Sequence, residues 1–168
     1  MHTLICLEGT SYAGKTTVAR LLLEQMPAVY GPRVASGWEE REEKIHQSPN
    51  PLARFSFFIK EIAARSEQVR QILEQIDVVM DRYLLSVLAY HNIIVGKHLK
   101  AELYVSNLRQ PDITILLTVN EMAVRQRMKN RPPRHQYESD PMFLLEVQRE
   151  FLRLIDRGKT IVIDTSIQ

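Results

Sequence analysis

A glycine-bounded loop near the start of the chain constrains the fold most strongly. Residues 9–16 read G-T-S-Y-A-G-K-T and fill the pattern G-x-x-x-x-G-K-[ST]. An apolar run at residues 4–7 precedes the loop and indicates a buried strand, and residues 18–26 read as a helix. The glycines let backbone N–H groups turn towards an anion, and the helix dipole adds about half a positive charge. This loop predicts a binding site for a nucleoside triphosphate.

Within this loop, Lys15 is expected to reach the β- and γ-phosphates, and the Thr16 hydroxyl is expected to ligate Mg²⁺. The residues expected to hold the nucleotide are Gly9, Thr10, Ser11, Tyr12, Ala13, Gly14, Lys15, Thr16 and Thr17.

The rest of the chain alternates apolar runs with amphipathic segments. Further strands are expected at residues 76–80, 112–119 and 160–164, with a short one in 28–30 and 33–35 around a Gly31-Pro32 turn. Further helices are expected at residues 38–45, 52–75, 84–94, 99–108, 121–130 and 141–155, the first of them charge-dense and solvated. The alternation predicts one α/β domain over residues 1–168, a three-layer P-loop fold with a five-stranded parallel sheet and a lid at about 131–140.

Composition bears on the binding partners and on the cellular location expected for the protein. The formal net charge of +2 favours neither nucleic acid nor a membrane surface as a partner, and no apolar run approaches the length of a membrane span. The single cysteine, Cys6, lies in the first apolar run, which favours a core position in a reducing compartment. That run begins almost at Met1, so we expect no targeting peptide and a cytoplasmic protein.

In parallel sheets, ligands bind at the carboxyl ends of the strands. Asp81 ends a predicted buried strand and is expected to complete the Mg²⁺ site; a helix cap is the less favoured alternative and is compatible with that role. Arg82 follows directly, and its planar guanidinium suits the phosphate of an acceptor; a surface salt bridge is the alternative. Both residues should lie beside the phosphate loop.

A basic segment follows the strand at 112–119. A mobile loop carrying arginines over the nucleotide would neutralise charge that develops during phosphoryl transfer. Arg127 and Arg131 are four residues apart and share a helix face, and Arg134 lies in the Pro-broken loop that follows. These three are preferred over Arg125 and Lys129, which are expected on the solvated helix face.

Three stretches together resemble the thymidylate kinase family of nucleoside monophosphate kinases. Besides the phosphate loop, residues 81–91 read D-R-Y-L-L-S-V-L-A-Y-H, similar to that family's D-R-Y-x-x-S-x-x-A-Y-Q. Residues 111–119 read P-D-I-T-I-L-L-T-V and resemble its P-D-x-T-x-x-L-x-V strand. The resemblance extends over nearly the whole chain.

The resemblance implies transfer of the γ-phosphoryl group of Mg-ATP to a (deoxy)nucleoside monophosphate, with dTMP as the first candidate acceptor. It implies ATP and Mg²⁺ as cofactors and a homodimer packed through long helices. The residues it implies for catalysis are Lys15, Asp81, Arg82, Arg131 and Arg134, with Thr16 and Asp81 at the metal and Arg127 at the nucleotide. The residues it implies for the acceptor are Arg33, Phe58, Arg65, Arg82, Ser86 and Tyr90.

The departures from the family pattern fall on the acceptor side. Ser11 stands where members usually carry an acidic residue that contacts the acceptor sugar, and an R-E-P-G-G-T segment is absent. Glu61 stands four residues before Arg65, where an aromatic usually stacks on thymine. Tyr12 occupies a position where some members carry a catalytic arginine, which directs that role to the lid. The identity of the acceptor therefore stays open.

Two other functions remain as alternatives. A deoxynucleoside kinase would need a carboxylate base after the second strand, which Glu39 within Trp38-Glu39-Glu40 could provide. A non-catalytic domain that retained ATP binding but lost its acceptor is the second. Turnover with thymidine, with thymidine monophosphate or with neither separates the three.

Overall fold

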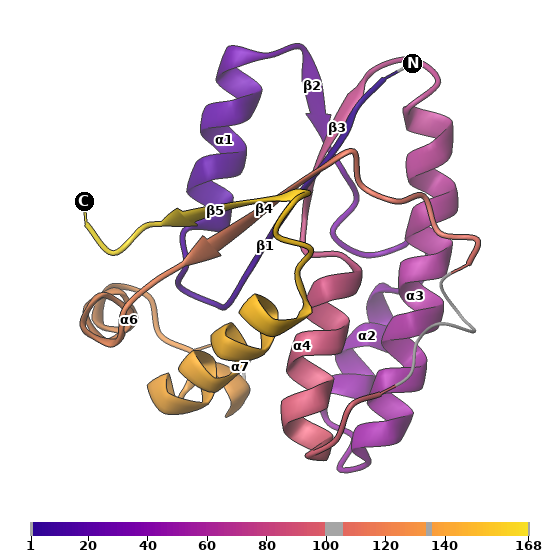
Figure 1. Ribbon diagram of the computed structural model, residues 1–168. Coiled ribbons are helices and arrows are strands. Elements are labelled where there is room, and N and C mark those ends of the chain that lie inside the picture. Colours follow the sequence, from indigo (N-terminus) through magenta and orange to yellow (C-terminus); the bar gives the residue numbers. More distant parts are fainter. Residues whose placement is uncertain (1, 100–105, 134–135, 168) are drawn as a thin grey trace.

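The computed structural model describes residues 2–99, 106–133 and 136–167. Its centre is a parallel sheet of five strands in the order β2-β3-β1-β4-β5 (Figure 1). The strands are β1 (Leu4–Gly9), β2 (Ala28–Tyr30), β3 (Asp77–Asp81), β4 (Ile113–Thr118) and β5 (Thr160–Asp164). The expected five-stranded parallel sheet is therefore confirmed.

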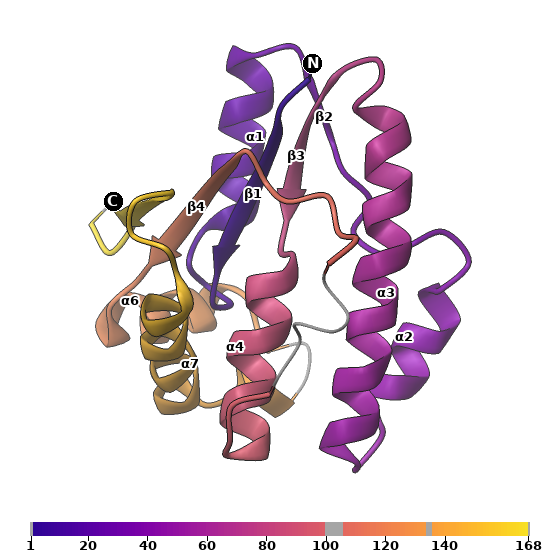
Figure 2. The same ribbon diagram turned by 45° about the vertical axis from the view of Figure 1, so that its right-hand side comes forward.

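Helices cover both faces of this sheet. They are α1 (Lys15–Gln25), α2 (Glu39–His46), α3 (Pro51–Ile72), α4 (Leu84–Val95), α6 (Glu121–Asn130) and α7 (Pro141–Leu154), with a short 3₁₀ helix η1 (Gln136–Glu138) before α7. Neighbouring α3, α4 and α7 lie side by side on one face (Figure 2). The other face carries α1 and α6, which gives the expected three layers.

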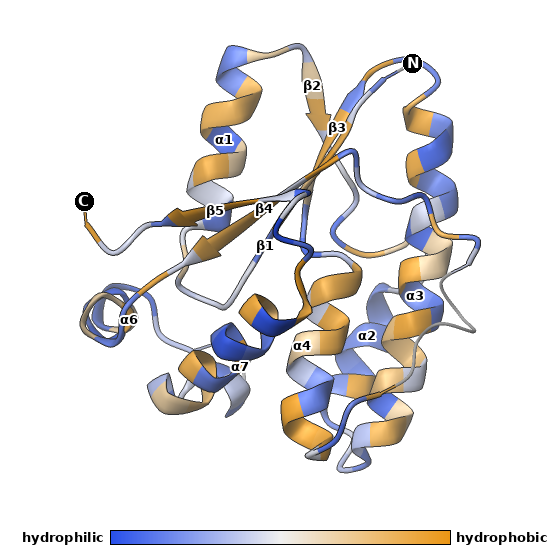
Figure 3. Ribbon diagram, in the orientation of Figure 1, coloured by the Kyte–Doolittle hydropathy of each residue, from blue (hydrophilic) through white to orange (hydrophobic). Residues whose placement is uncertain are grey.

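Strand alternation divides the core between these two faces. Leu4 and Cys6 of β1 pack with the apolar side chains of α3 and α4, whereas Ile5 and Leu7 pack with those of α1 and α6. Every residue of β1 is buried, and Figure 3 shows the inner strands as predominantly apolar. Cys6 is completely buried, as expected, and this burial raises the pKa of its thiol. A strand buried on both faces fixes the position of the loop that follows it.

The helix boundaries follow from local capping chemistry. Asn50, Asn120 and Asp140 each accept backbone N–H bonds at the start of α3, α6 and α7. Gly96 adopts the left-handed conformation after α4 and ends that helix, because a residue without Cβ tolerates this backbone. Each of these helices therefore begins or ends at a residue whose own chemistry favours the boundary.

Two segments, residues 33–35 and 99–108, differ from the expected secondary structure or lie partly outside the described residues. Residues 33–35 do not extend the second strand, because the Ala35 N–H donates to Glu61 Oε1 (2.9 Å) on α3 rather than to a sheet neighbour. That part of the prediction was wrong. Most of the helix expected at 99–108 falls on residues 100–105, outside the described residues, and residues 106–108 form a turn.

The sheet is less covered at the β5 edge. Ile161, Val162 and Ile163 are each at least 40% exposed, in contrast to the buried inner strands. Within the described ranges, no helix has the length and apolar character to cross a membrane.

Candidate active site

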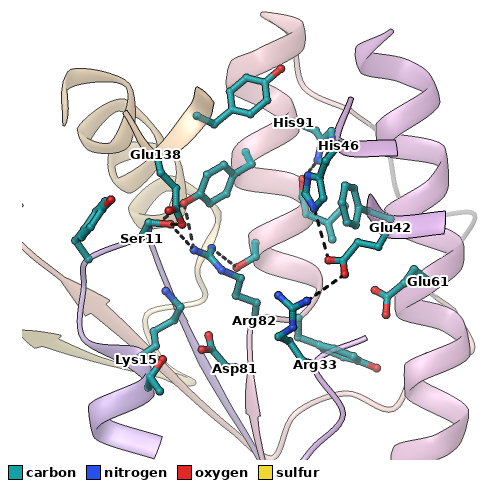
Figure 4. A pocket seen from close by; sticks show the side chains of 18 of the residues that line it. Ser11, Lys15, Arg33, Glu42, His46, Glu61, Asp81, Arg82, His91 and Glu138 are labelled. Carbon is teal, nitrogen blue, oxygen red and sulfur yellow. Dashed lines mark hydrogen bonds and ion pairs between the residues drawn. The ribbon is translucent and has the colours of Figure 1, made fainter. Parts of the chain in front are cut away.

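A cavity of about 660 Å³ opens at the carboxyl ends of β1 and β3. The phosphate loop, the turn after β3, three helices (α2, α3 and α4) and the segment around η1 all contribute lining residues. Figure 4 shows Lys15, Asp81 and Arg82 at one end and Glu42, His46 and His91 towards the other. The volume suits a small organic ligand.

The loop at residues 10–14 forms an anion cradle closed by Lys15. Gly9, Tyr12 and Gly14 have φ values of 136°, 67° and 87°, which turn the backbone sharply between β1 and α1. The Lys15 amine donates to the carbonyl oxygens of Gly9 (3.1 Å) and Thr10 (2.8 Å). Ser11, Tyr12, Gly14, Lys15, Thr16 and Thr17 line the cavity, whereas Gly9, Thr10 and Ala13 form the buried support behind them.

Lys15 is a buried amine with Arg82 and the carboxylates of Asp81, Glu8 and Glu138 around it. Burial lowers the pKa of Lys15 to about 7, and Arg82 acts in the same direction. Burial disfavours the protonated form of Lys15, and a negatively charged phosphate group beside the amine would offset this cost. The Lys15 amine is therefore positioned to bind an anion, and a bound anion would favour its protonated form.

The turn after β3 is held by the buried carboxylate of Glu8. Glu8 Oε1 accepts from the Tyr83 backbone N–H (2.9 Å), and Oε2 accepts from the Ser86 hydroxyl (2.5 Å). Burial raises the pKa of Glu8, which these hydrogen bonds and Arg82 partly offset. Arg82 adopts a φ of 68° in this turn, a left-handed conformation that is unusual for a residue with a Cβ. Glu8 is a positioning residue that the sequence motif did not reveal.

The backbone turn directs the Arg82 side chain across the cavity onto the phosphate loop. Its guanidinium donates to the Gly9 carbonyl oxygen (3.1 Å) and the Ser11 hydroxyl (3.1 Å), and lies over the Tyr90 ring. Ser86 and Tyr90 also accept from this guanidinium, at 3.4 Å each. Three of the residues predicted for the acceptor, Arg82, Ser86 and Tyr90, are therefore brought together beside Lys15.

Asp81 and Thr16 both line the same end of the cavity. Asp81 Oδ2 accepts from the Tyr30 hydroxyl (3.2 Å), whereas its buried Oδ1 has no hydrogen-bond partner in the described part of the chain. An oxygen-rich pair with an unused buried carboxylate oxygen suits Mg²⁺, which is bound through few protein ligands and keeps several waters. No cluster of three or more His, Cys, Asp or Glu side chains was found among the described residues.

The predicted lid arginines take different positions. Arg127 lines the cavity, donates to the Tyr12 carbonyl oxygen (2.7 Å) and binds Thr165, so its guanidinium ties the phosphate loop to the residue after β5. Arg131 lies over the Tyr12 ring, 4.4 Å from its centroid, at the rim of the cavity. Arg134 falls outside the described residues.

Glu138 of η1 brings the predicted lid segment into contact with the phosphate loop. The Ser11 hydroxyl donates to Glu138 Oε1 (2.7 Å), and Arg131 lies 3.6 Å from Glu138 Oε2. The carboxylate that is missing at position 11 of the sequence is thus replaced in space by one from residue 138. A linear motif could not show this, because the two residues lie 127 positions apart.

One side of the cavity is bounded by α3. Phe58 and Arg65, which the sequence predicted for the acceptor, both line the cavity, but the Arg65 guanidinium is bound by the protein itself. It donates to the carbonyl oxygens of Arg33 (3.1 Å) and Arg82 (3.3 Å) and lies 2.8 Å from Glu61. Glu61 pairs with Arg65 in this contact. Burial raises the pKa of Glu61, and Arg65 acts in the opposite direction. Arg65 therefore fixes the turn after β3 against α3.

The charge-dense helix α2 has no buried residue, as expected for a solvated helix, but two of its side chains also face the cavity. Glu42 and His46 line the cavity, and Glu42 lies 3.5 Å from Arg33 and 3.6 Å from His46 (Figure 4). Although burial acts in the opposite direction, His46 and Arg33 lower the pKa of Glu42, so its carboxylate is ionised at neutral pH. Glu39 is exposed and is not among the lining residues.

Three further lining residues were not identified from the sequence as site residues. Arg54 donates to the Tyr137 hydroxyl (2.6 Å) and lies over the Tyr137 ring, which connects α3 to η1 across the cavity. His91 packs against Phe55 and Phe58, each with its ring centroid at 5.6 Å. Spacing along α3 and α4 could have placed Arg54 and His91 on the faces of Phe58 and Val87, but it could not have shown that these faces line a cavity.

Comparison with known proteins adds an independent result. The family model described as Thymidylate kinase matches residues 7–168. A probable thymidylate kinase of Methanocorpusculum labreanum is 29% identical over 180 residues, covering 97% of this chain and 89% of that protein. One from Methanocaldococcus jannaschii is 30% identical over 178 residues, covering 96% and 86%.

Solved structures show the same fold at low identity. A thymidylate kinase from Candida albicans superposes with a TM-score of 0.77 at 19% identity, covering 98% of this chain and 84% of that one. A deoxyadenosine kinase from M. mycoides superposes with a TM-score of 0.71 at 17% identity, covering 99% and 93%.

Proposed function

The chain belongs to the thymidylate kinase family, and from this premise we propose how its residues transfer the γ-phosphoryl group of ATP to the 5′-phosphate of dTMP. Membership makes the chain an ATP-dependent phosphotransferase that uses nucleotide substrates. The observation that carries the assignment of roles is that Lys15 and Arg82 both donate to the Gly9 carbonyl oxygen, each at 3.1 Å. Two basic side chains at the same carbonyl oxygen could bind the γ-phosphate of ATP and the 5′-phosphate of the acceptor, which must come together for transfer.

On the donor side, the loop N–H groups and Lys15 bind the triphosphate, and Lys15 neutralises charge on the transferred group. Arg127 positions the loop through the Tyr12 carbonyl oxygen rather than by contact with substrate. Arg131, stacked on Tyr12 at the rim, supplies the lid cation. Arg134 stays a candidate for the same task.

Thr16 and Asp81 would hold Mg²⁺, Thr16 through its hydroxyl and Asp81 through the buried Oδ1. When bound, the ion neutralises charge on the β- and γ-phosphates. Tyr30 keeps the other Asp81 oxygen occupied, which leaves Oδ1 directed to the metal or its waters.

On the acceptor side, Arg82 orients the phosphate of dTMP. We expect Arg82→Ala to lower kcat/KM for dTMP by about a hundredfold or more, because a charge-assisted contact to phosphate is lost. The Kd for ATP, measured by fluorescence titration, should change less than about threefold, since the loop and Lys15 remain. Arg70→Ala, which removes an exposed arginine of α3, is the matched control. An Arg82→Ala enzyme that keeps wild-type kcat/KM for dTMP would disprove the assignment.

A second function, phosphorylation of a nucleoside 5′-hydroxyl, is favoured by one observation. The ionised carboxylate of Glu42 lines the cavity beside Arg33, and a hydroxyl acceptor needs a carboxylate of this kind as its general base. The residue that the sequence suggested for this task, Glu39, is exposed outside the lining.

The pair Glu42→Gln and Glu39→Gln separates the two functions. If dTMP is the acceptor, neither change should lower kcat by more than about tenfold, because an ionised phosphate needs no base. If thymidine is the acceptor, Glu42→Gln should abolish ADP release and Glu39→Gln should leave it unchanged. Assays of both proteins with thymidine and dTMP give the answer.

A homodimer and a cytoplasmic location complete the proposal, on the basis of the family resemblance. Sedimentation of the purified protein at micromolar concentration tests the dimer, and fractionation of cells tests the location.

A further inference from the structure

Two variable positions of the phosphate loop, Ser11 and Tyr12, contact the segment that follows α6. The Ser11 hydroxyl donates to Glu138 Oε1 (2.7 Å; Figure 4), and the Arg131 guanidinium lies over the Tyr12 ring, 4.4 Å from its centroid. Arg131 and Glu138 also pair with each other, at 3.6 Å. These four side chains form a closed ring of contacts between the loop and the predicted lid.

The Tyr12 backbone has a conformation that favours glycine. Its φ is 67°, in the left-handed region, where a residue with a Cβ is strained. The residue present is nonetheless a large aromatic one, and it is only 7% exposed. The Arg127 guanidinium donates to the Tyr12 carbonyl oxygen (2.7 Å) and so helps to fix this backbone. Because strained positions cluster at functional sites, the ring is a candidate for a task that glycine could not perform.

Arg131 is the lid cation of the proposed function, and its own helix does not hold it in place. The helix α6 ends at Asn130, and Arg131 has an extended backbone with Pro132 and Pro133 after it. Its side chain is 40% exposed. A long exposed side chain loses rotamer freedom when it binds a phosphate group. A ring that already holds the guanidinium by a cation–π contact reduces this loss.

We propose that Tyr12 is a positioning residue that holds the Arg131 guanidinium beside the phosphate loop, in a chain whose loop has no arginine of its own. This inference rests on the proposed function, in which Arg131 acts on the transferred phosphoryl group, and extends it to the residue that sets the position of Arg131. Glu138 attracts the same guanidinium by charge and is itself bound by Ser11. The aromatic ring and the carboxylate together give Arg131 one preferred orientation.

The variants Tyr12→Phe and Tyr12→Leu test this inference, because phenylalanine keeps the aromatic face and leucine does not. We expect Tyr12→Leu to lower kcat for dTMP about tenfold, while KM for dTMP and Kd for ATP change less than about threefold. Tyr12→Phe should keep kcat within about threefold of wild type. A wild-type kcat in Tyr12→Leu, or an equal loss of kcat in both variants, overturns the assignment.

A double-mutant cycle with Arg131→Ala separates the positioning of Arg131 from a purely structural role of the ring. If Tyr12 acts through Arg131, Tyr12→Leu should change kcat less than about twofold in the Arg131→Ala background. Arg125→Ala is the matched control, because it removes an exposed arginine of α6 that pairs with Glu121. In that background Tyr12→Leu should keep its full effect on kcat. Losses that multiply in the Arg131→Ala background contradict the proposal.

The NMR signal of the Arg131 Nε–H group gives a readout that does not depend on turnover. The ring current of Tyr12 should move this signal upfield, since the guanidinium lies over the ring. Tyr12→Leu should abolish the shift and Tyr12→Phe should keep it, whereas an identical signal in wild type and Tyr12→Leu overturns the contact. Failure of the proposed function appears differently, as absent ATP-dependent turnover of dTMP by the wild-type protein, and the Arg131 signal still decides the role of Tyr12 in that case.

Discussion

Replacing Lys15 with methionine should lower kcat/KM for dTMP by at least about a thousandfold. The Lys15 amine is buried beside the phosphate loop, where the effective dielectric is low, so it should strongly stabilise the charge that develops on the transferred phosphoryl group. Initial rates of ADP release over a range of ATP and dTMP concentrations measure the effect. A loss below about tenfold would remove Lys15 from the catalytic residues.

Unfolding does not explain such a loss. Burial lowers the pKa of Lys15 to about 7, which means that the folded protein accommodates the charged amine less well than water does. Methionine removes this penalty, so the urea midpoint of Lys15→Met should be no lower than that of wild type. Arg20→Met removes an exposed cation from the same helix and should change neither rate nor stability appreciably.

The largest expected effect on stability is that of Gly9→Ala. A Cβ at Gly9 would lie 2.4 Å from the Leu117 carbonyl oxygen of β4, and its φ of 136° is strained for any other residue. The obstacle is backbone in the centre of the sheet, so it cannot move aside without separating β1 from β4. We expect a loss of at least about 4 kcal/mol in the free energy of unfolding, from urea denaturation followed by circular dichroism.

Gly96→Ala is the matched control for this change. Gly96 also has a positive φ, 70°, but a Cβ there would meet no atom within 4 Å. Its expected loss is about 1 kcal/mol, the backbone penalty alone. Equal losses in the two variants would show that the clash with Leu117 is relieved by small shifts of the sheet.

Local patterns predicted the architecture well, for physical reasons. The strand before the phosphate loop is buried on both faces and therefore uniformly apolar, and the caps Asn50, Asn120 and Asp140 act within three residues of themselves. The second strand was predicted too long because Val34 and Ala35 follow a turn signal in an apolar stretch, whereas the Ala35 N–H donates to Glu61. That contact depends on α3, which the local sequence does not contain.

The site residues likewise fall into those that the local sequence predicts and those whose positions depend on tertiary packing. Lys15, Asp81 and Arg82 follow strand ends, and the topology of a parallel sheet brings such ends together. Glu42, Arg54 and Glu138 reach the cavity from helices and from the segment before α7, so their positions depend on how these elements pack. Arg65 shows the limit of a motif, because it lies where expected while its guanidinium is bound to the Arg33 and Arg82 carbonyl oxygens.

The left-handed backbone of Arg82 bears on how this position can vary. Such a conformation costs about 1–2 kcal/mol for a residue with a Cβ, and Glu8 and Arg65 hold the turn in place from either side. A glycine would satisfy the backbone best, yet it would leave no guanidinium beside the phosphate loop. Arg82→Gly would therefore relieve the backbone strain while removing the guanidinium, so stability and turnover should change in opposite directions at this one position.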